Sequence, residues 1–461
     1  MATFVLSPLD DHGHVNPTFG IARTLRSRGH RVVYCGIPDL ETLVEPEGFE
    51  FLPVLEELCP KGFQAEMLAR ASELRGLKLL RFLREVQRHE DRYHAAVLAG
   101  AFDKPFALLR PDLLLCDVLL PEPPLAAYGA GVPCLLLNTT LPLRQEAGQP
   151  PLTSPLVPDE GAVSRVRLRL AWWRATYRHR LGRWFRSRSV THLLRLARHH
   201  GFPRERLDFD GITIKPWGPE LVLCPREFAE LTPARGKLRG EYLYAGPSVD
   251  LERQEPDFPW ERLRDGRPLV LAYLGTLPYV TDLDARLFRA VRDAAARRPD
   301  WQFVLGVGRK LDPAAFDASA PNVIAVRRAP VVSLLRRATA MITHGGFNSV
   351  KECISLEVPM VVLPIQYDQP GISARVVRHG LGVRASPASV TAETLLSLLD
   401  EVVTVPRYRE NLRRFRARFE AAERERPAAD VIEDFLHPSR PAALSAGAPS
   451  PSSVPTARAL P

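Results

Sequence analysis

Short apolar runs and helix-spaced apolar positions alternate along the first part of the chain. The run at residues 3–7 predicts a buried strand, and a turn over residues 8–14 follows it. Apolar residues then recur at helical spacing over residues 17–28, and Gly29 closes this expected helix. The same order of strand, helix and strand returns over residues 113–116, 126–131 and 134–138. Such alternation is typical of a parallel sheet with helices on both faces.

The alternation restarts in the second half of the chain. Strands are expected over residues 269–274, 302–307, 323–326, 340–343 and 360–363. Two separate series predict two similar doubly wound α/β domains, with a junction between Phe228 and Tyr242. The expected division is a first domain over residues 1–232, a second over 240–405, a charged amphipathic helix over 406–436 and a disordered tail over 437–461.

The positive charge of the chain is concentrated in one segment. The 461 residues carry a formal net charge of +9, and residues 161–200 contain eleven arginines but no Asp or Glu. Because the excess is local, nucleic acid is not expected as a partner. We interpret residues 160–205 as a basic helical insertion with two alternative roles. It either lies on an anionic membrane surface or packs its aromatic side chains over an acceptor cleft while its arginines reach outward. The aromatic side chains concerned are Trp172, Trp173, Trp184 and Phe185.

The six cysteines form no CxxC pair, and most lie within apolar runs, so buried free thiols are expected. The first residues lack a basic region followed by a long apolar run, so no signal peptide is predicted. No uncharged apolar run approaches the length of a membrane span. We therefore expect a cytoplasmic protein. Peripheral contact with the inner face of a membrane, through residues 161–200, stays open.

A loop with two glycines follows the strand that ends at Thr343. Gly345 and Gly346 let the backbone come close to a ligand, and a helix is expected from about Asn348. The first N–H groups of a helix have no internal partners, and its dipole is positive at this end. This terminus is therefore expected to bind an anion such as a diphosphate, to which His344 adds a hydrogen-bond donor.

Three more side chains are placed to recognise the rest of a nucleotide sugar. Glu352 lies one turn beyond Asn348 on the same helix face, where it can accept hydrogen bonds from ribose hydroxyls. Asp368 and Gln369 follow the next strand, at the sheet edge where open α/β folds bind ligands. We expect these two residues to bind sugar hydroxyls.

This stretch resembles the donor-binding signature of the UDP-dependent glycosyltransferase superfamily. That group includes plant natural-product glucosyltransferases, bacterial macrolide glycosyltransferases and carotenoid glucosyltransferases. The matching positions are residues 344–349, Glu352, Val358, Pro359, Pro364, Asp368 and Gln369, with further matches at residues 13–17 and 274–276. The resemblance implies the GT-B fold, in which two Rossmann-like domains face each other, with the acceptor in the first, the donor in the second and the reaction in the cleft. It also implies that His344, Asn348 and Ser349 hold the diphosphate, with Thr276 beside them.

One part of the signature departs from the family pattern. Many members hold the nucleobase of the donor with an aromatic residue and a glutamine. At these positions this chain has Arg328 and Val331. Arg328 either stacks on a base through its planar guanidinium or is a solvated surface charge. Glu357 also replaces the usual glycine before Val358, which we interpret as a local change in the helix cap. Diphosphate binding is expected whichever role Arg328 has, whereas the identity of the nucleobase stays open.

Transfer to an alcohol needs a base near the acceptor. His14 follows the first strand and titrates near neutral pH, so it can accept a proton. Asp117 follows the strand at residues 113–116 on the same edge, where its carboxylate can fix the imidazole tautomer. Both positions also match the family, which implies a single inverting displacement. The alternatives are that His14 is only an exposed polar side chain, that the neighbouring His12 is the base, and that Asp117 only caps a helix.

No metal or other cofactor is expected. Two DxD patterns occur, Asp208 with Asp210 and Asp282 with Asp284, but such pairs arise readily by chance. The helix terminus supplies the positive field that a metal would provide. The loop at residues 305–310 resembles a dinucleotide-binding turn but lacks its third glycine.

The expected activity is transfer of a hexose from a nucleotide diphosphate sugar resembling UDP-glucose. The expected acceptor is a hydroxyl on a lipophilic small molecule such as a polyketide or carotenoid. Two alternatives stay open: a nucleotide-sugar epimerase or hydrolase on the same fold, and a non-catalytic partner that binds a nucleotide sugar.

Overall fold

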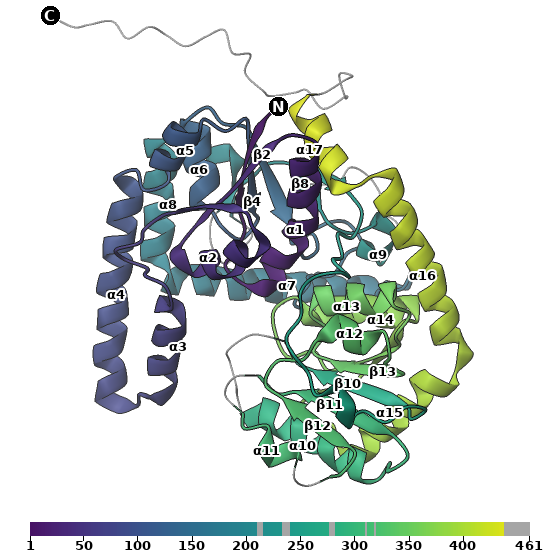
Figure 1. The fold of residues 1–461 in the computed structure, drawn as a ribbon. Helices are drawn as coiled ribbons and strands as arrows, with labels where there is room; N and C mark the ends of the chain where they lie inside the picture. Colours follow the sequence, from purple (N-terminus) through teal and green to yellow (C-terminus); the bar gives the residue numbers. More distant parts are fainter. Residues whose placement is uncertain (210–214, 233–239, 276–281, 309–310, 318–319, 438–461) are drawn as a thin grey trace, which may run out of the picture.

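Two parallel sheets, each with helices packed on its faces, form the body of the protein (Figure 1). The computed structural model describes residues 1–209, 215–232, 240–275, 282–308, 311–317 and 320–437. In Figure 1 one sheet lies above the other, and the last helices run along one side of both. The expected architecture of two facing doubly wound α/β domains is confirmed.

The first sheet has seven strands in the order β3-β2-β1-β4-β5-β8-β9, and every pair in it is parallel. Its central strands are buried on both faces, as their continuous apolar runs predict. The strands are β1 Thr3–Ser7, β2 Arg31–Gly36, β3 Glu50–Pro53, β4 Leu113–Asp117, β5 Cys134–Asn138, β8 Glu220–Val222 and β9 Tyr242–Tyr244. A separate antiparallel pair joins β6 Leu207–Asp208 to β7 Lys215–Pro216.

The second sheet has six parallel strands in the order β12-β11-β10-β13-β14-β15. They are β10 Leu269–Tyr273, β11 Gln302–Gly306, β12 Val323–Val326, β13 Ala340–Thr343, β14 Met360–Val362 and β15 Gly382–Arg384. In both sheets the strand order reverses between the first and fourth strands, β1 with β4 and β10 with β13. Open α/β sheets bind ligands beyond the carboxyl ends of the strands at such a reversal.

Helices of the first half connect its strands and form a projecting hairpin, α3 with α4. They are α1 His12–Ser27, α2 Pro38–Val44, α3 Phe63–Glu73, α4 Gly76–Leu98, α5 Asp103–Leu109, α6 Glu122–Gly129, α7 Ala162–Phe185, α8 Ser187–His199 and α9 Arg226–Ala229. Short 3-10 turns lie at η1 Glu45–Glu47, η2 Arg204–Arg206 and η3 Trp260–Arg262. The second half contributes α10 Asp282–Ala296, α11 Ala314–Asp317, α12 Val331–Leu335, α13 Phe347–Ser355, α14 Gln369–His379, α15 Ala392–Thr404, α16 Pro406–Glu425 and α17 Ala428–Leu436. No helix among the described residues has the length and apolar character needed to cross a membrane.

The expected turn over residues 8–14 is wrong in its second half, because α1 begins at His12. Asp11 caps this helix, and its carboxylate accepts a hydrogen bond of 2.7 Å from the backbone N–H of Gly13. Pro17 therefore lies inside the helix and does not start it. His14 consequently stands on the first turn of a helix, which gives its side chain a fixed direction.

The expected junction is also too early. Strand β9 lies after residue 240, yet it pairs with β8 of the first sheet, with Leu221 opposite Leu243. The chain therefore completes the first sheet before it crosses to the second, and the expected start of the second domain at residue 240 is wrong. A short apolar run such as β9 shows no preference for either sheet in its sequence.

The expected single helix over residues 406–436 is two helices, α16 and α17, with Arg426 and Pro427 between them. Proline has no N–H and clashes with the preceding turn, so the helix ends before it. Helix α16 packs on α13, whereas Ala428 and Ile432 of α17 join the core of the first domain. The C-terminal helices therefore tie the two domains together, as Figure 1 shows in yellow. Of the expected disordered tail, residues 438–461 lie outside the described residues.

Glu357, at the end of α13, adopts a left-handed backbone with a φ of 58°. This conformation costs a residue with a side chain about 1–2 kcal/mol, which is why glycine is usual there. Arg416 and Arg413 of α16 pair with the Glu357 carboxylate at 3.0 and 3.4 Å. The side chain that replaces glycine therefore contributes contacts to the packing of α16.

All six cysteines are free thiols; five are buried and Cys134 is partly exposed. Burial raises the pKa of Cys35, Cys134 and Cys224 to about 12, so these thiols stay protonated at neutral pH. The expectation of buried free thiols is confirmed.

The basic insertion forms α7 and α8. Trp172 is buried, and its indole N–H donates to the backbone oxygen of Gln149 at 2.7 Å. Trp173, Trp184 and Phe185 are instead 64 to 73 % exposed. The interpretation in which all four aromatic side chains pack inward is therefore wrong for three of them, because the helical period turns them away from the face that carries Trp172.

Candidate active site

His14 and Asp117 meet at the carboxyl edge of the first sheet. Asp117 ends β4 and is fully buried, and its carboxylate contacts Nδ1 of His14 at 2.7 Å. Its other oxygen accepts from the backbone N–H of Leu119 at 2.9 Å, which fixes the orientation of the carboxylate. The hydroxyl of Thr139, just after β5, also contacts Nδ1 of His14 at 2.9 Å. Because both contacts engage Nδ1, Nε2 is the nitrogen that remains to face a substrate.

The surroundings of His14 set its affinity for a proton. Burial lowers the pKa of His14, but the carboxylate of Asp117, and to a smaller extent those of Asp11 and Asp368, raise it to a net value of about 8. The partner carboxylate therefore makes this imidazole a stronger base than a free histidine. The rival His12 begins α1, and the carboxylate of Asp117 contacts His14.

Pro17 of α1 leaves one carbonyl of the helix without its usual partner. In an α-helix the N–H of each residue bonds the carbonyl four residues earlier, which for Pro17 would be Gly13. The carbonyl of Gly13 instead accepts from Nδ2 of Asn348 at 2.9 Å. Asn348 lies in the first turn of α13, so this bond joins the two domains next to His14. It brings the candidate base and the candidate diphosphate site to opposite sides of one cleft.

The loop before α13 is shaped by its glycines. Gly345 has a φ of 83°, and a side chain there would come within 2.7 Å of Val362. A side chain at Gly346 would come within 2.5 Å of the ring of His344. Gly346 is the N-cap of α13, and no side chain caps this helix. The first N–H groups of α13 therefore face the cleft as donors for an anion.

His344 differs from His14 in its surroundings. It is 9 % exposed, and burial lowers its pKa to about 4, an effect that a hydrogen bond with the backbone of Tyr273 only partly opposes. Among the described residues its Nδ1 has no hydrogen-bond partner. A neutral imidazole with an unsatisfied ring nitrogen fits a hydrogen-bonding role toward a ligand. Ser349, on the first turn of α13, is also buried, whereas Thr276 lies outside the described residues.

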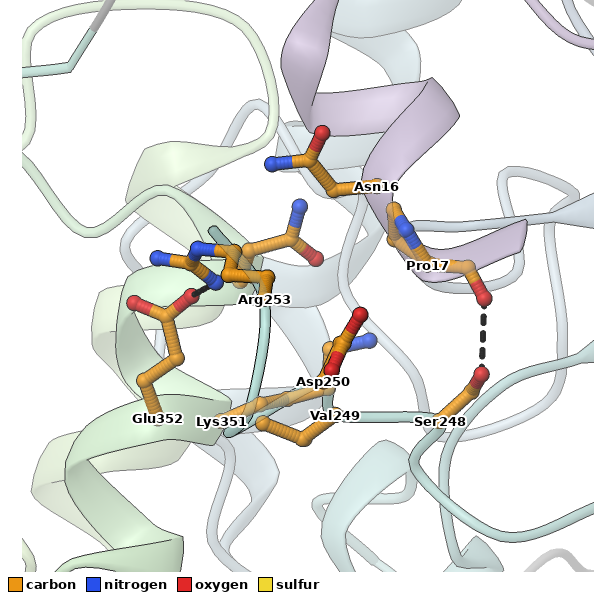
Figure 2. Close-up of a pocket in the computed structure, with 9 residues that line it drawn as sticks. Asn16, Pro17, Ser248, Val249, Asp250, Arg253, Lys351 and Glu352 are labelled. Carbon is orange, nitrogen blue, oxygen red and sulfur yellow. Dashed lines mark hydrogen bonds and ion pairs between the residues drawn. The ribbon is translucent and has the colours of Figure 1, made fainter. Parts of the chain in front are cut away.

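Glu352 is 5 % exposed and pairs with Arg253 at 2.5 Å (Figure 2). Arg253 was not predicted from the sequence; it comes from the segment between β9 and β10 that connects the two sheets. Arg253 also contacts Glu255 at 3.7 Å, and Glu255 accepts from the N–H groups of Val332 and Ser333 at 2.8 Å each. The pair uses one oxygen of the Glu352 carboxylate, which leaves Oε2 to accept from a ligand.

Figure 2 shows the small pocket beside this pair, between α1, the connecting segment and α13. Asn16 of α1 faces it from the first domain. Ser248 lines the same pocket and donates to the backbone oxygen of Pro17 at 2.7 Å. The connecting segment is therefore fastened to the same helix that carries His14.

Asp368 and Gln369 lie where β14 leads into α14 and differ in what their side chains do. Burial raises the pKa of Asp368 to about 6, although its own backbone N–H and His14 oppose the shift. Asp368 therefore faces the same cleft as His14 and is mostly ionised at neutral pH. The side-chain oxygen of Gln369 accepts from the N–H groups of Ile365 and Gln366 at 2.8 and 2.9 Å. Gln369 thus stabilises the loop that contains Ile365 and Gln366, and only its amide nitrogen remains to bind a sugar hydroxyl.

Of the two residues expected at the nucleobase of the donor, one lies on the surface and the other in the core. Arg328 is exposed, whereas Val331 is 5 % exposed and packs in a hydrophobic cluster. The side chain of Val331 therefore offers no polar contact to a nucleobase. The phenol of Tyr273, at the end of β10, has its pKa raised to about 12, chiefly by burial and next by Glu352. Tyr273 thus adds an aromatic ring close to Glu352 that the sequence analysis missed.

Of the four aspartates in the DxD patterns, the structure describes the side chain of Asp208 alone. Asp208 is buried and pairs with Arg144 at 3.2 Å, and Asp210 lies outside the described residues. The side chains of Asp282 and Asp284 are likewise outside the description. Within the described part of the chain, no three His, Cys, Asp or Glu side chains are grouped as metal ligands.

Comparison with known proteins agrees with this geometry. Residues 276–422 match the family model described as UDP-glucoronosyl and UDP-glucosyl transferase. The matched stretch contains α13, its glycine loop and the start of α14, the elements that carry the candidate diphosphate site.

The likeness extends over nearly the whole chain. The protein is 26 % identical to the zeaxanthin glucosyltransferase of Pantoea ananas, over 95 % of this chain and 96 % of that protein. It is 27 % identical to the demethyllactenocin mycarosyltransferase of Streptomyces fradiae, over 95 % of this chain and 87 % of that protein. Its fold matches the crystal structure of the glycotransferase of kitacinnamycin with a TM-score of 0.64 at 24 % identity, over 94 % of this chain and 98 % of the other. The chain is a glycosyltransferase of the GT-B fold and belongs to the UDP-glycosyltransferase superfamily.

Proposed function

We propose that this enzyme transfers a hexose from a UDP-sugar to a hydroxyl of a lipophilic small molecule, with inversion at the anomeric carbon. The single observation that carries the proposal is the joint placement of the His14–Asp117 pair and the α13 terminus. The pair is 2.7 Å apart, and the bond from Asn348 to Gly13 fastens the two elements together at 2.9 Å. A base and an anion site thus face one cleft, as a direct displacement requires.

In the proposed step, Nε2 of His14 takes the proton of the acceptor hydroxyl. The acceptor oxygen forms a bond to the anomeric carbon while the bond from that carbon to the β-phosphate oxygen breaks. The electron pair of the broken bond leaves with the nucleoside diphosphate. Asp117 stabilises the imidazolium that forms and keeps Nδ1 protonated before the step.

The leaving diphosphate gains negative charge on its β-phosphate as the bond breaks. The uncapped N–H groups of α13 and its dipole stabilise that charge, and the neutral His344 and the Ser349 hydroxyl add hydrogen bonds. The proposal therefore assigns no step to a metal or another cofactor. Glu352 binds the ribose through Oε2, Asp368 and the amide of Gln369 bind the sugar, and Thr276 and Arg328 are proposed as further donor-binding residues.

The acceptor class is inferred from the site and from the relatives. One relative is named for zeaxanthin and another for demethyllactenocin, and both align along nearly the full chain. We infer a hydroxylated, largely apolar acceptor bound against the first domain. We place the reaction in the cytoplasm, at the inner face of a membrane from which such an acceptor is drawn.

The test is a transfer assay with UDP-, TDP- and GDP-hexoses against a panel of hydroxylated polyketides and carotenoids. We expect a UDP-sugar to be consumed only when an acceptor is present, and NMR to show inverted anomeric configuration in the product. Release of nucleotide or a new sugar without acceptor would instead indicate a hydrolase or an epimerase. Retention of configuration would contradict the single displacement.

A donor-binding control separates binding from chemistry. Replacing Glu352 with Gln should weaken binding of the UDP-sugar roughly tenfold, because a hydrogen bond to a charged group is lost. Calorimetry on this variant and on wild type measures the change. Unchanged affinity would contradict the assignment of Glu352 to the ribose.

A further inference from the structure

Helix α7 carries a continuous apolar face on its solvent side. Eight of its apolar side chains are between 44 and 73 % exposed. We call them the α7 stripe: Val163, Val166, Leu170, Trp173, Tyr177, Leu181, Trp184 and Phe185. Nearly all follow one another at intervals of three or four residues, so they cover an arc of roughly 120° on one side of the helix. The buried Trp172 and Ala175 lie on the opposite side.

Arginines border the α7 stripe along both of its edges. The same helical spacing places exposed arginines at each edge. They are Arg167, Arg174 and Arg178 on one side and Arg169 and Arg180 on the other. Because no Asp or Glu occurs in residues 161–200, the acidic and basic side chains of α7 and α8 are all basic. The surface is therefore complementary to an apolar layer covered by anions.

Single exposed apolar residues are common on proteins, whereas a continuous exposed apolar face marks a site of interaction. Aromatic rings such as those of Trp173, Tyr177 and Trp184 are favoured at the boundary between lipid tails and headgroups. Arginine binds the phosphates of that boundary. We propose that the α7 stripe docks on the surface of a membrane containing anionic lipids, with α7 lying in the plane of the bilayer.

A second copy of the chain fits this surface less well. Two α7 stripes packed on each other would bring their arginine edges together, and residues 161–200 offer no carboxylate to offset that repulsion. Anionic lipid supplies both the apolar layer and the opposite charge.

The loop before α7 connects the docking surface to the candidate active site. This loop begins at Thr139, whose hydroxyl contacts His14. Further along, the backbone oxygen of Leu152 accepts from the N–H of Gly371 in α14 at 2.7 Å, and Gln149 accepts from Trp172 on α7. A docked α7 would therefore hold the cleft beside the lipid that contains a lipophilic acceptor. This consequence rests on the proposed function, whereas lipid binding itself does not.

The test measures binding of the full-length protein to vesicles in the absence of any substrate. One set contains phosphatidylcholine and phosphatidylglycerol in equal parts, and the other contains phosphatidylcholine alone. We expect co-sedimentation with the anionic set at least roughly tenfold stronger than with the neutral set, because several arginines lie near the surface. High salt should reduce it, and tryptophan fluorescence should shift to shorter wavelength on binding.

Paired variants identify the surface. Trp173→Ser combined with Trp184→Ser, and separately Arg174→Glu combined with Arg178→Glu, should each weaken anionic-vesicle binding roughly tenfold. Leu108→Ser on α5 and Arg409→Glu on α16 alter equally exposed positions elsewhere and should leave binding unchanged. All four variants should keep the wild-type melting temperature and transfer sugar to a detergent-dispersed acceptor. Loss of docking and loss of sugar transfer are thus measured separately.

Three results would overturn the proposal. The first is wild-type protein that sediments equally with both vesicle sets, or with neither. The second is binding of the stripe variants as strong as that of wild type. The third is a wild-type dimer, seen by light scattering, that Trp173→Ser with Trp184→Ser dissociates, which would assign the face to contact between copies.

Discussion

The two halves of this glycosyltransferase repeat one architecture, yet they place a histidine in opposite electrostatic surroundings at the same kind of edge. His14 follows the first strand of its sheet and contacts a buried carboxylate, so its pKa is raised to about 8. His344 follows the fourth strand of its sheet, where burial dominates and lowers its pKa to about 4. The first imidazole therefore attracts a proton, and the second stays neutral.

The groups around a histidine at a Rossmann-like strand end therefore determine its protonation state. In the first domain, β4 brings Asp117 alongside α1, where its carboxylate raises the pKa of His14. In the second domain, the equivalent edge carries a glycine loop and the uncapped end of α13, which suit an anion. The hydrogen bond from Asn348 to the Gly13 carbonyl then joins these two edges across the cleft. Substitutions at His14, Asp117, His344 and Pro17 test this contrast.

Replacing His14 with Ala removes the proposed base and should have the largest effect. We expect kcat to fall by roughly 10²–10⁴, the usual contribution of general base catalysis. Affinity for the UDP-sugar, measured by calorimetry, should stay within about twofold, because His14 belongs to the other domain. Comparable turnover in variant and wild type would remove His14 from the mechanism.

Replacing Asp117 with Asn keeps the shape of the pair and removes its charge. We expect kcat to fall by roughly 10²-fold, because the imidazolium loses its partner and the tautomer is no longer fixed. Without the carboxylate, burial is the main remaining influence, so the pKa of His14 should fall and the rate should reach its plateau at lower pH. A pH profile identical to that of wild type would show that Asp117 does not act through His14.

Replacing His344 with Ala should lower kcat/KM by roughly 10-fold to 100-fold, because one hydrogen bond to the charged leaving group is lost. The contrast with His14 lies in the pH profile, whose rising limb should keep its wild-type position. His344→Asn, which retains a donor, should recover part of the rate. A shift of the limb in either variant would contradict the neutral role of His344.

Replacing Pro17 with Ala should have the smallest effect of the series. The new N–H can bond the Gly13 carbonyl within α1 and so compete with Asn348 for it. Loss of one such hydrogen bond corresponds to a decrease in kcat of roughly twofold to tenfold, with donor affinity unchanged. Asn348→Ala should reproduce the kcat effect, and an unaffected Pro17→Ala variant would show that the bridge is not needed for transfer.

Much of the fold and part of the candidate site could be predicted from the sequence. The apolar runs of β1, β4, β10 and β13 indicated parallel strands, and the spacing from His344 to Gln369 indicated the glycine loop and α13. These features depend on neighbours in sequence, where periodicity and turn residues carry the information. The pairing of His14 with Asp117 was also predictable, since both follow strands that end at one edge.

Features that depend on packing between distant segments could not be predicted in this way. The membership of β9 in the first sheet and the Arg253–Glu352 pair join segments that no sequence pattern relates. Val331 was placed at the nucleobase because of its position in the family signature, yet its apolar side chain is buried in the core. Local signals were present for two of the misses: Asp11 before Gly13 is a recognisable helix cap, and Pro427 a recognisable helix end.

The central claim is that the His14–Asp117 pair supplies a base that must lose its proton before transfer. The most direct test is the pH dependence of kcat/KM for the acceptor at saturating UDP-sugar, in wild type and in Asp117→Asn. Because the base works only when deprotonated, the wild-type rate should rise with pH and level off above about 8, and the variant should level off at lower pH. A rate that is flat through this range, or a rising limb that the variant leaves in place, would contradict the claim.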